Sequence, residues 1–109
     1  PEVTAPGVGI ISTSDPEMTI PYSASTGTSD ATVFVTGALA LILERHGEAI
    51  PSGNSSRFGI SLVKQALADS CQPNALQGEG HHPRWGYGTL DALAWERNVA
   101  DAIAQNNDT

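Results

Sequence analysis

The stretch 27-GTSDATVFVTGALALILE-44 decides the fold of this chain, because a turn of small residues stands directly before an almost unbroken apolar run. From Ala31 to Leu43 the apolar residues fall on every side of a helical wheel, with only Thr and Gly residues between them. The β-branched residues near its start would favour a strand, but the length of the run and the Ala-Leu repeat that follows favour a helix. We therefore expect a helix that is buried on all sides.

The segments around this helix predict a mixed α/β chain. Residues 8–13, VGIIST, predict a short buried strand between turns, and residues 14–28 predict a loop. A second helix is expected to be capped by Ser55 or Ser56, and Asp91 is positioned to start a third. The apolar stripe of the second helix consists of Phe58, Leu62, Val63, Ala66 and Leu67, and that of the third consists of Trp95, Val99 and Ile103.

These elements offer too little cover for a helix that is apolar on every side. A chain of this size buries roughly two thirds of its surface on folding, and two amphipathic helices with one or two strands cannot enclose residues 31–43. More protein is expected around them. The chain starts at Pro1 and shows no signal-like segment, so we expect a processed or truncated chain.

Composition restricts the classes of function. The 109 residues are 39% hydrophobic and 16% charged, which fits one globular domain or a piece of one. Twelve acidic against five basic residues give a formal charge of −7, and no basic cluster could track a phosphate backbone, so nucleic acid is not an expected partner. The longest apolar run is shorter than the about 20 residues that a membrane span needs.

Ser29 is the candidate functional residue, and its position has two interpretations. A hydroxyl in the first turn of a helix can cap free N–H groups there. An exposed hydroxyl at that place can also act as a nucleophile, because the helix-terminal N–H groups would stabilise the oxyanion that its attack on a carbonyl creates. The second interpretation requires a base and an orienting carboxylate.

One source of such partners is the nucleophile elbow of an α/β-hydrolase. Residues 27–31, GTSDA, match its G-x-S-x-G pattern except at the last glycine, and Asp69 followed by His81 or His82 has the required order. The elbow must follow a buried strand, however, and residues 21–26 are polar. We therefore disfavour this arrangement.

Three stretches in register carry a family resemblance. They are PEVTAPGVGIIST at residues 1–13, GTSDATVFVTG at 27–37 and GYGTLDALA at 86–94. They resemble, in order, the strand and Ala-Pro-Gly turn, the serine motif, and the closing Gly-x-Gly turn with its helix in the subtilisin-like serine proteases, or subtilases. The resemblance covers nearly the whole chain, and it makes residues 1–109 similar to the C-terminal segment of a subtilase catalytic domain.

The resemblance implies a fold and a role for Ser29. The fold is a three-layer α/β arrangement with a mostly parallel sheet, in which residues 29–46 form the central helix. Ser29 would attack a peptide carbonyl, and its own N–H would form half of the oxyanion hole beside Gly27, Thr28 and Asp30. In subtilases the order is Asp, His, Ser, so a companion N-terminal segment would supply the acid, the base and the oxyanion Asn. His46, roughly 25 Å along the helix at about 1.5 Å per residue, is not the base.

The resemblance also implies protein or peptide substrates, a secreted location and calcium as a stabiliser, although no cluster of oxygen ligands places a calcium ion in this chain. Two residues depart from the family pattern. Val33 replaces a proline that would fix the first turn, and its presence is expected to loosen that turn. Asp30 follows the nucleophile, where its charge would oppose an oxyanion unless the side chain points away and caps the helix. These departures motivate an alternative, a catalytically inactive subtilase-derived binding or structural module.

Two other groups of residues are expected to carry no chemistry. Glu79, His81 and His82 lie in a polar loop without the spacing of a tetrahedral metal site, so no metal ligands are predicted. Cys71, the single cysteine, cannot form an internal disulfide. It has no basic neighbour to lower its pKa, so we expect an inert thiol.

Overall fold

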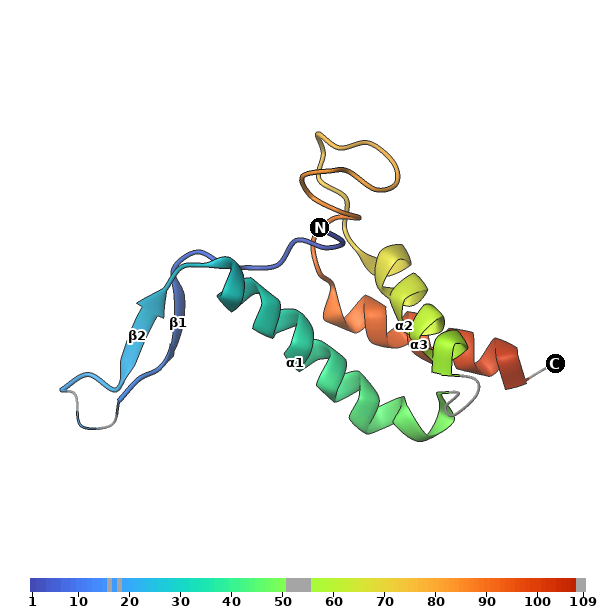
Figure 1. The fold of residues 1–109 in the computed structure, drawn as a ribbon, viewed down its shortest axis with the longest axis horizontal. Coiled ribbons are helices and arrows are strands. Elements are labelled where there is room, and N and C mark those ends of the chain that lie inside the picture. Colours follow the sequence, from blue (N-terminus) through green and yellow to red (C-terminus); the bar gives the residue numbers. More distant parts are fainter. Residues whose placement is uncertain (16, 18, 51–55, 108–109) are drawn as a thin grey trace.

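A computed structural model of the chain describes residues 1–15, 17, 19–50 and 56–107. Its elements are β1 (Ile10–Thr13), β2 (Tyr22–Ser25), α1 (Thr28–His46), a 3₁₀ turn (Gly47–Ala49), α2 (Ser56–Ser70) and α3 (Ala92–Asn107). The strands form a hairpin that projects from the N-terminal end of α1, away from α2 and α3 (Figure 1). The mixed α/β composition agrees with the sequence prediction.

The two strands are antiparallel, and their register pairs Ile10 with Ser25 and Thr13 with Tyr22. The prediction of a loop over residues 14–28 is therefore wrong at β2, whose four residues, YSAS, give almost no apolar signal and are ordered by pairing with β1. The prediction of a buried strand is also wrong, because most of β1 and all of β2 are exposed. A parallel sheet is not seen in the described residues, where parallel pairing is limited to an isolated bridge between Thr4 and Thr89.

Helix α1 runs for 19 residues and begins one residue before the predicted helix of residues 29–46. It is not buried on all sides, since within this chain only Ala38 and Ile42 are fully buried among its described residues. Val35 and Leu39 pack against the core from the same side. The opposite faces are open, and they expose the large side chains of Val33, Phe34, Leu41 and Leu43.

Helices α2 and α3 hold most of the core. Leu62, Ala66 and Leu67 of α2 pack against the stripe of α3, in which Trp95 and Val99 are almost completely enclosed, as predicted. The Trp95 indole N–H donates to the carbonyl oxygen of Val63 at 3.1 Å, so its polar atom is satisfied inside the core. Ser55 and the side chains of Ser56 and Phe58 lie outside the described part of the structure.

The third helix begins where the sequence predicts. Asp91 Oδ1 accepts a hydrogen bond from the Ala94 N–H at 3.0 Å, which caps the helix. The preceding turn places Gly86 and Gly88 at φ 63° and 128°, where a side chain would be strained. At both glycines an added Cβ would also collide with backbone, that of Glu2 at Gly86 and that of Gln72 at Gly88. The closing Gly-x-Gly turn is thus required by its packing.

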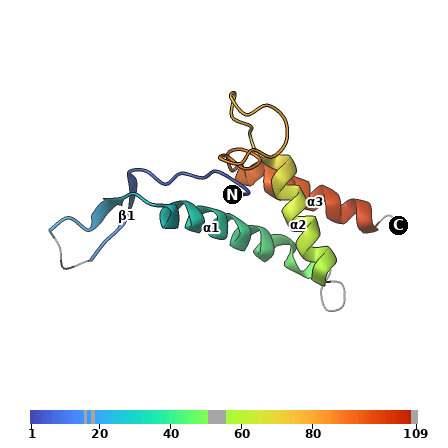
Figure 2. The same ribbon diagram turned by 45° about the horizontal axis from the view of Figure 1, so that its top comes forward.

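The described chain is elongated. Its radius of gyration is 16.5 Å and its extents are 57 × 36 × 21 Å, whereas a compact domain of about 100 residues has a radius of gyration of about 13 Å. Figure 2 shows the cause, because α1 and the hairpin extend far beyond the pair formed by α2 and α3. Within the described residues, no helix has the length and apolar character to cross a bilayer.

Candidate active-site segment

Ser29 lies in the first turn of α1, one residue after the helix begins. Gly27 is the N-cap residue in an extended conformation, and no side chain caps this end of the helix. Ser29 is exposed, and no hydrogen bond to its hydroxyl or N–H is found within the described part of the chain. The capping interpretation of Ser29 is therefore wrong.

The turn before Ser29 is fastened to the segment that leads into β1. The Gly27 N–H donates to the carbonyl oxygen of Gly7 at 2.8 Å, and the Gly9 N–H donates to Thr26 Oγ1 at 3.0 Å. The approach is so close that a Cβ on Gly7 would stand 2.8 Å from the Gly27 carbonyl oxygen. This explains why glycine occupies position 7 of the Ala-Pro-Gly turn.

Asp30 turns toward the hairpin. Its Oδ2 accepts a hydrogen bond from Ser25 Oγ at 2.9 Å, and the same oxygen lies against Gly27. The suggestion that Asp30 caps α1 is wrong, because no side-chain cap is present. Its carboxylate instead connects the end of β2 with the first turn of α1.

The start of α1 is regular although Val33 replaces proline. The helix continues without a break from Thr28 to His46. Thr32 Oγ1 donates to the Thr28 carbonyl oxygen at 2.9 Å, and Thr36 Oγ1 donates to the Thr32 carbonyl oxygen at 3.1 Å. These bonds satisfy both hydroxyls on the helix itself.

The histidines are separated from Ser29 in the fold. His46 lies at the opposite end of α1, as predicted, where its Nε2 lies 2.7 Å from Glu96 Oε1. The hydrogen bond from His46 lowers the pKa of Glu96, and the Arg45 guanidinium at 3.5 Å acts in the same direction. This pair fastens the C-terminal end of α1 to α3.

The other two histidines also make contacts of their own. The His81 Nε2 lies 2.8 Å from the carbonyl oxygen of Pro1, and the ring of His82 stacks on Trp85. Asp69 accepts a hydrogen bond from Gln65 on α2. The structure does not bring these residues to Ser29, so the α/β-hydrolase arrangement is not formed.

Metal and thiol chemistry find no support in the geometry. The described residues contain no group of three or more His, Cys, Asp or Glu side chains that could hold a metal ion, so calcium is assigned no step here. Cys71 is buried, and burial raises the pKa of its thiol, with the negative charge of Asp91 as a smaller cause. A thiol of this kind is a poor nucleophile.

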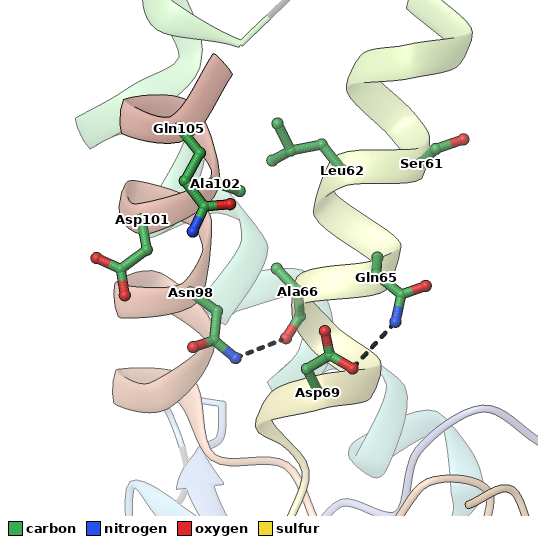
Figure 3. Close-up of a pocket in the computed structure, with 9 residues that line it drawn as sticks. All are labelled: Ser61, Leu62, Gln65, Ala66, Asp69, Asn98, Asp101, Ala102 and Gln105. Carbon is green, nitrogen blue, oxygen red and sulfur yellow. Dashed lines mark hydrogen bonds between the residues drawn. The ribbon is translucent and has the colours of Figure 1, made fainter. Parts of the chain in front are cut away.

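A groove of about 630 Å³ lies between α2 and α3. Figure 3 shows two hydrogen bonds among its lining residues, in which Asn98 donates to the Ala66 carbonyl oxygen and Gln65 donates to Asp69. Ser29 is not among its lining residues. The groove is therefore separate from the turn that carries the candidate nucleophile.

The turn, its hydroxyl and the closing glycines agree with the comparison to known families. The model of the subtilase family (peptidase S8) matches residues 1–88. The chain belongs to the subtilase family. Its members are serine peptidases, so the match supports a serine-protease kind of function for this subtilase chain. No solved structure matches the chain significantly.

The sequence does not predict two contacts that hold this part of the subtilase chain together. Ser25 was assigned to a loop, and its hydrogen bond to Asp30 is visible only once β2 is formed. The contact of Gly7 with Gly27 joins segments that the sequence separates by β1 and β2. For the strand β2, the available sequence signal was the alternation of Tyr and Ala with Ser in residues 22–25, which is too weak to predict a strand.

Proposed function

We propose that Ser29 is the nucleophile of a serine endopeptidase, and that residues 1–109 are the C-terminal segment of its catalytic domain. The observation that carries the proposal is the exposed hydroxyl of Ser29 in the first turn of a long helix, unoccupied by any cap within the described chain. The N-terminal end of a helix carries a partial positive charge of about half a unit, which would stabilise a negative oxygen beside it.

The reaction divides peptide hydrolysis into two steps. Ser29 Oγ attacks the carbonyl carbon of the substrate while its proton passes to a histidine, and the carbonyl oxygen becomes an oxyanion that the Ser29 N–H helps to bind. The C–N bond then breaks, the amine leaves with the proton, and an ester on Ser29 remains. Water hydrolyses this ester and regenerates the hydroxyl.

The base must come from elsewhere in the enzyme, because the three histidines of this chain are engaged away from Ser29. We assign the histidine, the acid that orients it and the second oxyanion donor, an asparagine, to a companion segment. The same segment would contribute the strands of a mostly parallel, three-layer sheet. The parallel bridge between Thr4 and Thr89 and the open faces of α1 support this assignment.

The test is covalent labelling of the complete protease, that is, this chain with its companion segment. A fluorophosphonate should form an adduct on the peptide that contains Ser29. Ser29→Ala should abolish the adduct and lower kcat by roughly 10⁶-fold. Ser61→Ala, which removes an exposed hydroxyl from α2, is the matched control and should leave both unchanged.

A second candidate is a subtilase-derived binding or structural module without catalysis. The observation that favours it is the carboxylate of Asp30 next to Ser29, where a negative charge opposes an oxyanion. If this chain assembles with the companion segment but the assembled protein gives no adduct on Ser29, the second function is correct and the first is refuted.

A further inference from the structure

We propose that Ser25 and Asp30 are a positioning pair for the nucleophile, and that their hydrogen bond holds the turn in which Ser29 stands ready to attack. This inference rests on the proposed function of Ser29. Ser29 is the group that attacks, whereas Ser25 and Asp30 fix the geometry of the turn that carries it.

The pair spans the turn from one side. Ser25 is the last residue of β2 and Asp30 lies in the first turn of α1, and the 2.9 Å bond between Ser25 Oγ and Asp30 Oδ2 closes the chain around residues 26–29. Asp30 Oδ2 also lies 3.5 Å from the place that a Cβ on Gly27 would occupy. The carboxylate therefore bonds to Ser25 on one side of the segment that carries the nucleophile and lies near Gly27 within it.

The other side of the turn is held by the backbone. Gly27 donates to the Gly7 carbonyl oxygen at 2.8 Å, and Thr26 accepts from the Gly9 N–H at 3.0 Å. These two bonds fix the turn up to Gly27. Beyond Gly27, among the described residues, the bond between Ser25 and Asp30 is the side-chain link from the hairpin to the helix.

The need for such a link follows from the exposure of Ser29. Ser29 is exposed and gains no orientation from a described neighbour. A displacement of about 1 Å at a reacting atom can cost about 100-fold in rate, so a bond that restrains the turn affects kcat directly.

The hydrogen bond and the negative charge of Asp30 make opposite predictions. If the hydrogen bond matters, Asn at position 30 retains function, because its amide oxygen accepts from Ser25 as the carboxylate does. If the charge matters by opposing the oxyanion, removing it raises the rate. The exposed Ser23 lies on the same face of β2 as Ser25 and is a matched control for the loss of a serine hydroxyl.

The experiment measures kcat, KM and the rate of fluorophosphonate labelling in the complete protease. Ser25→Ala and Asp30→Ala should each lower kcat and the labelling rate about 10-fold with little change in KM. The double variant should be no slower than either single variant, because both remove one bond. Asp30→Asn should stay within about 2-fold of the parent, and Ser23→Ala should match the parent.

The outcomes separate this inference from the proposed function. A parent enzyme without an adduct on Ser29 refutes the proposed function, and the positioning pair with it. A labelled parent whose Ser25→Ala variant is equally fast refutes the pair alone. An Asp30→Asn variant that is faster than the parent, or as slow as Asp30→Ala, also refutes it. Circular dichroism of each variant identifies any that fails to fold, and rescue by Asp30→Asn then decides the role.

Discussion

The two halves of the described chain differ in how far their apolar side chains are buried. Helices α2 and α3 turn theirs toward each other, so that Trp95 and Val99 are 2% and 0% exposed. Helix α1 and the hairpin present theirs outward, so that Val33 is 63%, Leu41 69% and Ile11 74% exposed. The C-terminal half supplies most of the core, to which α1 adds Ala38 and Ile42, whereas most large apolar side chains of the half with the candidate nucleophile stay exposed.

This difference shows which part of the subtilase chain depends on other protein. Large exposed apolar surfaces mark interaction sites in soluble proteins. Here the exposed apolar side chains lie on α1, the same helix that carries Ser29 in its first turn. The surface that needs a partner and the candidate catalytic turn therefore belong to one element. Assembly with the companion segment that we propose would therefore complete the core and the active site together.

The largest expected effect tests the C-terminal half. Trp95→Ala in the 109-residue chain should lower the free energy of unfolding by about 3–5 kcal/mol, because it empties the centre of the core and leaves the Val63 carbonyl oxygen without its donor. Urea unfolding followed by circular dichroism measures the change. Trp85→Ala, the same substitution at a half-buried loop position, should cost clearly less. Equal losses would mean that α2 and α3 do not form the stable core.

An intermediate effect compares identical substitutions in the two halves. Val99→Ala should lower the free energy of unfolding of the isolated chain by about 2 kcal/mol, since Val99 is fully buried. Val33→Ala should leave it unchanged or slightly higher, because Val33 is exposed in a helix and alanine is the better helix former.

The same valine pair sharpens the comparison when measured in the complete protease. If a companion segment covers α1, Val33→Ala should become destabilising there, while the cost of Val99→Ala should stay the same. A Val33→Ala variant that is neutral in both contexts would contradict the assignment of this face to the companion segment.

The smallest expected effect concerns the ion pair that joins the halves. Because His46 lowers the pKa of Glu96 in the folded state, the carboxylate stabilises the fold above its ordinary pKa, and this contribution is lost as the pH falls through the lowered value. The difference in melting temperature between the parent and Glu96→Gln should therefore shrink as the pH falls below the ordinary pKa of a glutamate. Glu44→Gln, an exposed position on α1, should show no such trend.

Local patterns in the sequence predicted the three helices and the core stripe of α3. The periodicity around Trp95 and the cap at Asp91 are properties of neighbouring residues, and both are confirmed. The hairpin was missed because β2 is stabilised by its partner strand and not by its own residues. The burial of β1 was overestimated for a related reason, since an apolar strand predicts a partner surface, and the described residues do not provide one.

In the candidate site, too, local patterns predict the features that depend on neighbouring residues and miss those that depend on distant contacts. The motif placed Ser29 at a helix start and His46 at the far end, and the structure agrees. The hydrogen bond between Ser25 and Asp30 and the contact between Gly7 and Gly27 depend on how the hairpin folds back, which no local pattern records. The role of Ser29 itself stays a prediction until it is labelled.

The junction of Thr4, Thr89 and Gln72 affects the order in which the molecule folds. Thr4 bonds to Gly88 and Leu90, and Thr89 bonds to Gln72 in both directions, so the first residues are fixed by residues near position 89. Contacts between such distant positions form late, and chains are synthesised at about 5–20 residues per second. Gly7, which holds the turn before Ser29, lies three positions after Thr4. The junction can therefore form only after residues 88–90 have been made, whereas the bond of Gly27 to Gly7 needs no residue beyond position 27.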